Sequence, residues 1–237
     1  MDFGSWLLGF IEAEGSFSIN KGRYPHFSLG QDEKEILEKI QDFFKVGAVA
    51  RQGYNWCYHV YGHNCWHIRE FCESKLIITE RIKQFEKWKG LKWLPQQSKK
   101  LNLNIDHTVN FADWLTGFIE GEGSFSVSGR KIYPEFSISQ KSKEILEKIK
   151  YFFGGIGNIR KTGNKIAWQY TVSNRLCWVI RNFCEGKLVM KKRRVQFENW
   201  KVLKWSTPFY LSQVKKEGNR SRKIYKSYFG ILGEQYE

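Results

Sequence analysis

The sequence predicts an α+β protein made of two tandem copies of one unit, each with an antiparallel β-sheet and helices packed on it. Three observations support this prediction. Near-identical stretches recur 108 to 112 residues apart. Within each copy, some short segments alternate apolar and polar residues, as strands do, and others repeat apolar residues at helical spacing. The predicted order in each copy is helix, two strands, helix, two strands, helices.

The duplication is clearest in one ten-residue stretch. Trp6-Leu-Leu-Gly-Phe-Ile-Glu-Ala-Glu-Gly15 recurs as Trp114-Leu-Thr-Gly-Phe-Ile-Glu-Gly-Glu-Gly123, and Ser-Phe-Ser follows both copies. The period is too long for a solenoid, so one domain has been doubled. We expect the copies at residues 1–94 and 111–206, with a polar linker at 95–110. The basic tail at 207–237 suits a solvated end and a polyanion contact equally well.

Each element of the first copy has a local signature. Phe3 to Glu14 is an apolar helix, and we expect Gly15 to stop it in a left-handed turn. Alternation around Phe17 and Phe27 predicts two strands. The later elements are an amphipathic helix from Ile36 to Phe44, a hairpin from Val46 to Tyr61 turning at Gly53, and helices at about 65–73 and 79–92.

Each apolar helix carries two small residues four apart, Gly9 and Ala13 in one copy and Gly117 and Gly121 in the other. Such a stripe lets another backbone approach closely, so we expect the two helices to pack against each other. The alternative is that each helix packs only on its own sheet.

Pairing would bring Glu14 and Glu122 together in the last turns of their helices, where the helix dipole disfavours an anion. A divalent cation such as Mg²⁺, shared with a phosphate, would offset both effects, so both glutamates are predicted metal ligands. Glu12 and Glu120 point about 200° away on the helix. We expect them to make interface or backbone hydrogen bonds.

The net charge of +15 and the pI near 9.6 favour a nucleic-acid partner. A membrane-surface protein is disfavoured, because no apolar run reaches the roughly eighteen residues of a span and no signal peptide precedes the repeat. We therefore expect an intracellular protein in a compartment that holds DNA, either a prokaryotic cytoplasm or an organelle matrix.

The five cysteines are odd in number and form no Cys-x-x-Cys pair, so they are interpreted as small core residues. One cluster, His59, His63, Cys65 and His67, could be imagined as a zinc site or a His-Asn-His nuclease. The second copy lacks it, because Thr171, Arg175, Cys177 and Val179 stand at those positions. Metal binding there is disfavoured.

The polar faces of the two sheets are predicted to form a DNA-binding saddle, since β-ribbons can enter a major groove and polar side chains read base edges there. The halves differ along this face, which suits a long, imperfectly palindromic target. The predicted DNA-binding residues are Ser18, Asn20, Lys21, Arg23, His26, Ser28 and Arg51 in the first copy, and Ser126, Ser128, Arg130, Lys131, Glu135, Ser137, Arg160, Lys161, Lys165 and Gln169 in the second.

The doubled motif, Leu7 to Gly15 and Leu115 to Gly123, resembles that of the LAGLIDADG homing endonucleases of the single-chain, two-repeat type. The resemblance implies a monomer with internal pseudo-two-fold symmetry, in which Glu14 and Glu122 bind metal at the helix interface. It implies cleavage of both strands of a long double-stranded DNA site, leaving short 3′ overhangs. Mg²⁺ or Mn²⁺ would support cleavage, and Ca²⁺ would be a non-productive substitute.

The resemblance also implies a polar residue at the start of the second helix, which falls on Gln31 and Gln140. A basic residue after the penultimate helix completes each site in that family. In the second copy, Lys191 or Lys192 occupies this region, while the first copy has Thr79 and Glu80. For the first copy, the candidates are Lys75, Arg81 or Lys83. The predicted mechanism is metal-assisted hydrolysis without a covalent intermediate, at chemically unequal sites.

Three other functions are weighed against DNA cleavage. An RNA-splicing maturase on the same scaffold would not need the carboxylates; both glutamates are present, which favours cutting without excluding a dual function. A transcription regulator would be expected to lose an acid or to add a helix-turn-helix domain. An intein is disfavoured because the chain begins with Met and ends in Gln-Tyr-Glu.

Overall fold

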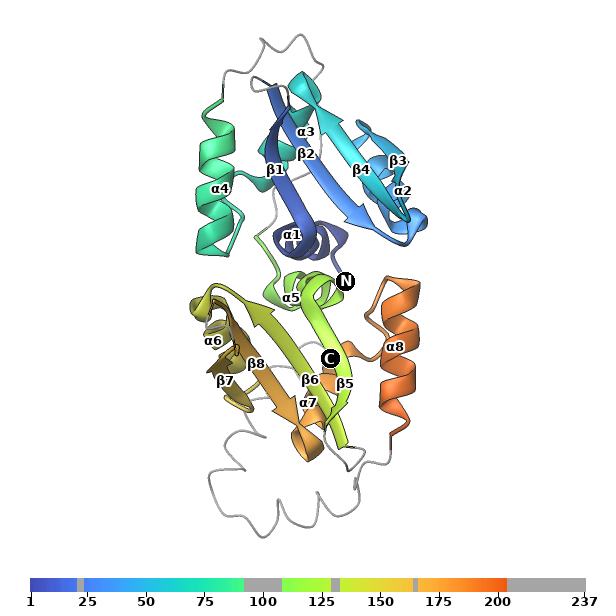
Figure 1. Cartoon of the computed structure of the whole chain (residues 1–237), viewed down its shortest axis with the longest axis vertical. Coiled ribbons are helices and arrows are strands. Elements are labelled where there is room, and N and C mark those ends of the chain that lie inside the picture. Colours follow the sequence, from blue (N-terminus) through green and yellow to red (C-terminus); the bar gives the residue numbers. More distant parts are fainter. Residues whose placement is uncertain (21–23, 92–107, 129–132, 164–165, 204–237) are drawn as a thin grey trace. The chain divides into compact units, whose positions relative to one another are not determined.

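The computed structural model describes residues 1–20, 24–91, 108–128, 133–163 and 166–203. It confirms the predicted α+β class, with two four-stranded antiparallel sheets and helices packed on each (Figure 1). The predicted linker at 95–110 lies mostly outside the described residues, and the tail at 207–237 lies wholly outside them. No helix in the described ranges is long and apolar enough to cross a membrane.

The first copy follows the predicted order of elements, and its sheet has the strand order β1-β2-β4-β3. Asp2 caps its first helix by accepting hydrogen bonds from two backbone N–H groups. The elements are α1 (Phe3–Glu14), β1 (Gly15–Asn20), β2 (Tyr24–Gln31), α2 (Lys34–Phe44), β3 (Ala48–Gln52), β4 (Asn55–Tyr61), the 3₁₀ turn Gly62–Asn64, α3 (Cys65–Cys72) and α4 (Thr79–Lys89).

The second copy repeats this order, and its sheet has the matching strand order β5-β6-β8-β7. Its elements are α5 (Phe111–Glu122), β5 (Gly123–Ser128), β6 (Tyr133–Gln140), α6 (Lys143–Phe152), β7 (Asn158–Lys161), β8 (Trp168–Ser173), the 3₁₀ turn Asn174–Leu176, α7 (Cys177–Cys184) and α8 (Lys191–Lys201).

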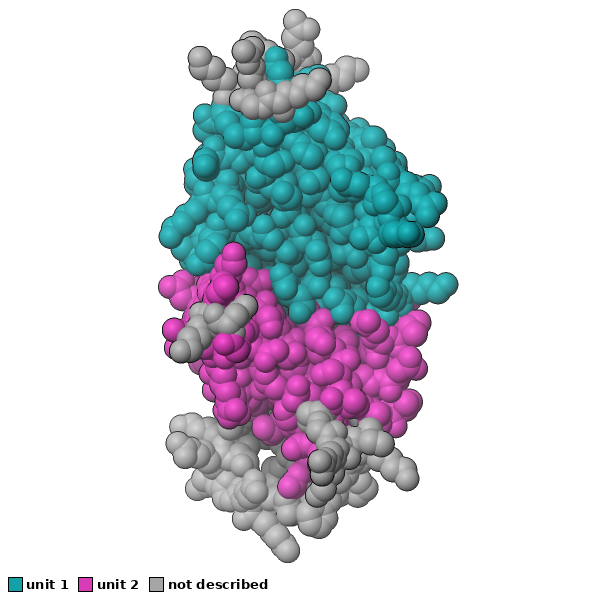
Figure 2. Space-filling view, in the orientation of Figure 1, with its two compact units in different colours: residues 1–122, 188–193 teal, residues 123–187, 194–237 magenta. Residues whose placement is uncertain are grey.

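The chain divides into two compact units that do not coincide with the sequence copies (Figure 2). The first unit holds residues 1–122 and 188–193, and the second holds 123–187 and 194–237. Both motif helices, α1 and α5, therefore belong to the first unit, together with the first residues of α8.

Each sheet buries one face and leaves the other polar. Phe27, Leu29 and Tyr58 are fully buried, on the face covered by α2 and α3. The opposite face of the first sheet, which we call its polar face, is formed by Ser16, Ser18, Asn20, Tyr24, His26, Ser28, Gly30, Ala48, Ala50, Gln52, Asn55, Cys57, His59 and Tyr61. The polar face of the second sheet holds Ser124, Ser126, Glu135, Ser137, Ser139, Asn158, Arg160, Gln169, Thr171 and Ser173.

Two local predictions are confirmed and one is wrong. Gly53 turns the second hairpin with a φ of +62°, and all five cysteines are buried. Gly15, however, is extended, with φ −70° and ψ 147°. It is needed for a different reason, because a Cβ there would lie 2.6 Å from the carbonyl oxygen of Ile11. The chain thus passes from α1 straight into β1 without a left-handed turn.

Candidate active site at the paired helices

The predicted packing of the two motif helices is confirmed. A Cβ on Gly9 would lie 1.8 Å from the carbonyl oxygen of Trp114, and a Cβ on Gly117 would lie 1.9 Å from that of Trp6. A Cβ on Gly121 would lie 2.4 Å from the Cβ of Ala13. The small residues are therefore required by the close approach of the α1 and α5 backbones (Figure 1).

Glu12 is buried in this interface and accepts three hydrogen bonds. Its Oε2 accepts from Trp114 Nε1 at 2.7 Å, and its Oε1 accepts from the backbone N–H groups of Ile77 at 2.9 Å and Ile78 at 2.6 Å. Burial raises the pKa of the Glu12 carboxyl to about 7, against the opposing effect of these bonds. Glu12 therefore ties α1 to α5 and to the segment that leads into α4.

Glu120 repeats this arrangement from the other helix. Its Oε2 accepts from Trp6 Nε1 at 2.5 Å, and its Oε1 accepts from the backbone N–H of Met190 at 2.6 Å. Burial raises the pKa of this carboxyl as well. The prediction that Glu12 and Glu120 make interface and backbone hydrogen bonds is confirmed.

Glu14 lies at the end of α1 with its carboxylate against the last turn of α5. Its Oε1 would be 3.5 Å from a Cβ placed on Gly121, the residue before Glu122. Burial raises the Glu14 pKa, while the charges of Arg193 and Arg81 and a hydrogen bond from Gln31 lower it. The first unit thus gathers the predicted metal ligands at the end of the helix pair.

Two arginines hold the ends of the motif helices. Arg81 donates to the carbonyl oxygens of Glu12 at 2.8 Å, Ala13 at 2.9 Å and Gly15 at 2.9 Å. Arg193 donates to those of Glu120 at 2.7 Å and Gly121 at 2.8 Å. These carbonyls belong to the helix ends that have few intrahelical partners. Each guanidinium therefore caps a helix and brings positive charge to the glutamates.

The charge of Arg81 interacts with that of Glu122 as well as with those of Glu12 and Glu14. Arg81 was one of the three candidates expected from the sequence, whereas Arg193 was not expected. The sequence does contain evidence for Arg193, because Arg81 and Arg193 are 112 residues apart, the same offset as Phe85 and Phe197 in the two copies. An identical cation at one repeat position was stronger evidence than the lysines that occur in only one copy.

Gln31 is the last residue of β2, and Gln140 is the last residue of β6. Both were expected at the start of a helix, so this expectation is corrected. From the strand end, the Gln31 side chain hydrogen-bonds Glu14.

Lys191 and Lys192 also lie elsewhere than expected. Their backbone N–H groups donate to the Glu33 carboxylate at 2.8 and 2.5 Å, and the Lys192 ammonium pairs with Asp32. The Glu33 carboxylate therefore caps the start of α8, where the helix dipole favours an anion. These lysines of the second copy lie beside the Gln31 strand end of the first copy.

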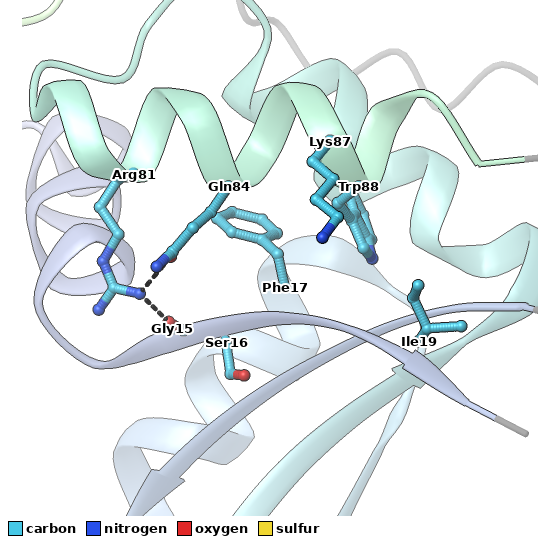
Figure 3. Close-up of a pocket in the computed structure, with 8 residues that line it drawn as sticks. All are labelled: Gly15, Ser16, Phe17, Ile19, Arg81, Gln84, Lys87 and Trp88. Atoms are coloured by element: carbon cyan, nitrogen blue, oxygen red, sulfur yellow. Dashed lines mark hydrogen bonds between the residues drawn. The ribbon is translucent and has the colours of Figure 1, made fainter. Parts of the chain in front are cut away.

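Arg81 also forms one end of a pocket of about 380 Å³ between β1 and α4 (Figure 3). Its Nη1 donates to Gln84 Oε1 at 3.1 Å as well as to the Gly15 carbonyl. The remaining lining is Ser16, Phe17, Ile19, Lys87 and Trp88, so polar groups of α4 face the edge of β1 across the opening.

The residues of this site fit a divalent cation shared with a substrate. Glu14 is partly exposed, so a ligand can reach it. Its burial disfavours the ionised carboxylate, and a bound cation would offset this cost by its opposite charge. No group of three His, Cys, Asp or Glu side chains suited to a metal occurs among the described residues. Two carboxylates with further oxygen ligands from phosphate and water match the coordination that Mg²⁺ prefers.

Comparison with known proteins agrees with this geometry. The sequence matches the family described as LAGLIDADG endonuclease over residues 7–91 and 115–203. The chain belongs to the LAGLIDADG endonuclease family. Each match covers one of the two repeats, and together they span most of the chain.

Related LAGLIDADG proteins include intron-encoded ones. The chain is 29% identical over 224 residues to the probable intron-encoded endonuclease 4 of Neurospora crassa, matching 84% of this chain and 39% of that protein. It is 31% identical over 187 residues to the intron-encoded RNA maturase bI4 of Saccharomyces cerevisiae, matching 73% of this chain and 27% of that protein. The chain spans less than half the length of these relatives.

Solved LAGLIDADG structures share the fold. The homing endonuclease I-GzeII in complex with its DNA target has a TM-score of 0.66 and 21% identity, matching 95% of this chain and 97% of that chain. The meganuclease I-SmaMI bound to uncleaveable DNA has the same score and identity, matching 83% of this chain and 88% of that chain. I-SmaMI has also been solved with an uncleaved DNA target in the presence of calcium ions.

Most described DNA-binding candidates of this LAGLIDADG protein lie on the polar faces of their sheets. Arg51 and Lys161 do not, and this corrects the expectation. Arg51 pairs with Trp56 and shares its side of the strand with Val49, while the Lys161 ammonium lies 5.3 Å from the Trp168 ring centroid. Outside the described residues are Lys21, Arg23, Arg130, Lys131 and Lys165, and the side chain of Ser128 is not described either.

The imagined zinc cluster of the first repeat is dispersed. Cys65 is buried and its thiol contacts the carbonyl oxygens of Val60 at 3.1 Å and Pro25 at 3.4 Å. His67 is buried on α3, and His59 lies on the polar face of the first sheet. The candidates that would have formed one site therefore serve the core and the sheet surface separately.

Proposed function

We propose that this protein is a homing endonuclease that cuts both strands of a long, imperfectly palindromic DNA site with a divalent metal, leaving short 3′ overhangs. The observation that carries the proposal is the meeting of the motif-helix ends, where Glu14 lies against the last turn of α5 and Arg81 interacts with Glu122. Two carboxylates at a helix seam in a chain of net charge +15 suit phosphodiester hydrolysis better than a structural role.

Glu14 and Glu122 would hold the metal, for which we propose Mg²⁺, with Mn²⁺ as an active and Ca²⁺ as an inactive substitute. When bound, the ion supplies Lewis acidity toward the phosphate and charge neutralisation at the leaving oxygen. Gln31 fixes the Glu14 carboxylate by hydrogen bonding. Arg81 and Arg193 hold the helix ends so that both carboxylates keep their places while the substrate enters.

Lys192 is proposed as the cation that stabilises charge developing on the phosphate near Gln31. Its ammonium is paired with Asp32, at the same strand end as Gln31. At the corresponding position of the other copy stands Glu80, and Lys141 follows Gln140. The two cleavage sites therefore differ in their cations, so we expect the two strands to be cut at different rates and nicked DNA to accumulate first.

The polar faces of the sheets are proposed to read base edges in the major groove. Their side chains are hydroxyl, amide, imidazole, carboxylate and guanidinium groups, which make the usual base contacts. The cations of α4 at the β1 pocket, Arg81 and Lys87, suit contact with the phosphate backbone. The protein would act as a monomer, and an organelle matrix is the compartment we propose, since one relative is described as a mitochondrial protein of Saccharomyces cerevisiae.

The proposal is tested by incubating the protein and Mg²⁺ with a duplex that joins the sequences flanking its own gene's insertion point. We expect double-strand cleavage near the junction, with 3′ overhangs on mapped ends and with nicked duplex forming first. The proposal would be refuted if the duplex stays intact at saturating protein concentration and at salt concentrations low enough for the protein to bind it. Equal single-turnover rates on both strands would refute only the inequality of the two sites.

A second candidate function is splicing of the intron RNA. It is favoured by one observation, the 31% identity to a protein described as an intron-encoded RNA maturase. RNA binding would use the basic surface and would not need the two carboxylates. If the chain is a maturase, the variants Glu14→Gln and Glu122→Gln should promote splicing of the intron as well as the unmodified protein does.

A further inference from the structure

Two imidazoles are hydrogen-bonded to each other across the polar face of the first sheet. His26 on β2 and His59 on β4 are joined through His26 Nε2 and His59 Nδ1, which are 3.1 Å apart. The Nδ1 of His26 is 2.9 Å from Ser18 Oγ on β1. The ring of Tyr61 stacks on His26, with centroids 4.4 Å apart and planes 7° apart. Three strands therefore hold this pair in one orientation.

The Ser18 hydroxyl has one proton, which it can donate to the carbonyl oxygen of His26 at 3.3 Å or to His26 Nδ1 at 2.9 Å, and this choice sets the proton positions of both rings. In the first arrangement the proton is donated to the carbonyl oxygen. The hydroxyl oxygen therefore accepts from His26 Nδ1, and His26 Nε2 is left without a proton. His26 Nε2 then accepts from His59 Nδ1, so the lone pair of the second ring is on His59 Nε2.

His59 Nε2 faces outward with its lone pair unused. Within the described part of the chain, His59 Nε2 has no hydrogen-bond partner. The buried polar atoms without a partner are others, so this nitrogen is accessible to solvent. The sulfur of Cys57 lies 3.9 Å from Nδ1 of the same ring. In this arrangement the neutral pair presents one acceptor on the surface proposed to meet DNA.

We propose that His59 is a specificity-determining residue whose Nε2 accepts a hydrogen bond from an exocyclic amino group in the major groove, adenine N6 or cytosine N4. The inference rests on the proposed function, because it needs a DNA major groove over the first sheet. These amino groups are the donors that bases show there. Ser18 and His26 are positioning residues, since they act by fixing the proton on His59 Nδ1.

The second repeat provides an internal contrast. Glu135 takes the place of His26, Thr171 that of His59, and Ser173 that of Tyr61. Ser173 Oγ donates to Glu135 Oε2 at 3.2 Å. An ionised carboxylate offers only acceptor atoms, whereas an imidazole gains a donor when it is protonated. The two half-sites therefore present different groups to the DNA at this position.

Protonation of His59 would convert its Nε2 from an acceptor to a donor. The groups that face the pair are Ser18 from β1, Cys57 and Tyr61 from β4, and Ala48 opposite His59 on β3. Burial lowers the pKa of both imidazoles. The pKa of His26 is lowered further by electrostatic repulsion from His59. The neutral, acceptor form therefore holds at about pH 8, and the donor form appears only below the pH at which an ordinary imidazole is protonated.

The test measures binding of the full chain to a panel of junction duplexes in which each base pair is replaced by the other three, with Ca²⁺ present. At about pH 8 we expect one position of the first half-site to prefer adenine or cytosine by roughly three- to tenfold. At about pH 5.5 the preference there should shift toward guanine, whose N7 and O6 accept.

Two variants separate the acceptor from a merely structural role. His59→Phe keeps a ring but removes the acceptor, so the preference at that position should disappear at both pH values. Ser18→Ala leaves His59 in place but releases the tautomers, so the position should accept both donor and acceptor bases. Thermal unfolding checks that each variant is folded. If His59→Phe does not fold, the change in base preference of the unmodified protein between the two pH values tests the role of His59.

The outcomes separate two failures. If no duplex of the panel is bound in preference to unrelated DNA, the proposed function fails and this inference falls with it. If the junction is bound specifically but its base preferences are the same at both pH values and in both variants, the proposed function stands and the role of His59 is refuted.

Discussion

The replacement Gly117→Ala tests the helix pairing that brings the catalytic carboxylates together. An added Cβ would lie 1.9 Å from the carbonyl oxygen of Trp6, whereas ordinary contact begins at 3.4 Å. The obstacle is backbone rather than a flexible side chain, so the two helices must separate by about 1.5 Å. No rotamer change can relieve the clash.

The cost has two parts. Overpacking of a tight core typically costs about 1–3 kcal/mol. A separation of this size would also break the bond between Trp6 Nε1 and the buried Glu120, now 2.5 Å long, at about 1.5–3 kcal/mol for a bond to a charged group. The total of about 3–6 kcal/mol would be a large share of an ordinary domain's stability. The melting temperature should fall by about 6–24 °C.

Thermal unfolding and single-turnover cleavage are the assays, with Gly163→Ala as the matched control. Gly163 has no neighbour within 4 Å of an added Cβ, and no positive φ requires glycine there. The control should change the melting temperature by less than about 2 °C. In folded Gly117→Ala at low temperature, cleavage should fall more than DNA binding. Unchanged stability and cleavage would refute the close helix contact as the basis of the site.

Three further outcomes are expected. Glu12→Ala should destabilise the protein by about 2–5 kcal/mol, because three N–H donors lose their acceptor, and hydrogen exchange at Ile77 and Ile78 should accelerate; unchanged exchange would contradict this role. Arg193→Leu should reduce cleavage more than binding, and Arg193→Lys should restore it only in part, because one ammonium cannot donate in the fork geometry of a guanidinium. Since burial raises the Glu14 pKa above the ordinary value of a glutamate and only the carboxylate binds metal, the cleavage rate at subsaturating Mg²⁺ should fall on acidification at a higher pH than an exposed glutamate would cause; a midpoint in the range of an exposed glutamate would argue against Glu14 as a ligand.

The sequence predicted those features that depend on local pattern or on the repeat. Alternation placed the strands, the small-residue stripe predicted the helix contact, and the geometry of a helix turn separated Glu12 from Glu14. Glu12 and Glu120 make the interface and backbone hydrogen bonds expected of them, because helical periodicity turns them away from Glu14 and Glu122. These predictions needed no knowledge of long-range contacts.

Other features depend on contacts between distant segments, which one sequence does not reveal. Lys192 was assigned to the second copy, yet it pairs with Asp32, 160 residues earlier. Gly15 was expected in a left-handed turn, but the nearby Ile11 carbonyl requires glycine for a steric reason instead. Arg51 had the correct charge, but the strand register put it on the other side of the sheet.

The most direct test of the account compares DNA binding and cleavage of the junction duplex for Glu14→Gln and Glu122→Gln. The account predicts that both metal-site variants bind the duplex with nearly unchanged affinity in Ca²⁺ but lose cleavage in Mg²⁺ by at least about a thousandfold. If both variants still cut the duplex at rates near that of the unmodified protein, the paired carboxylates are not the catalytic centre.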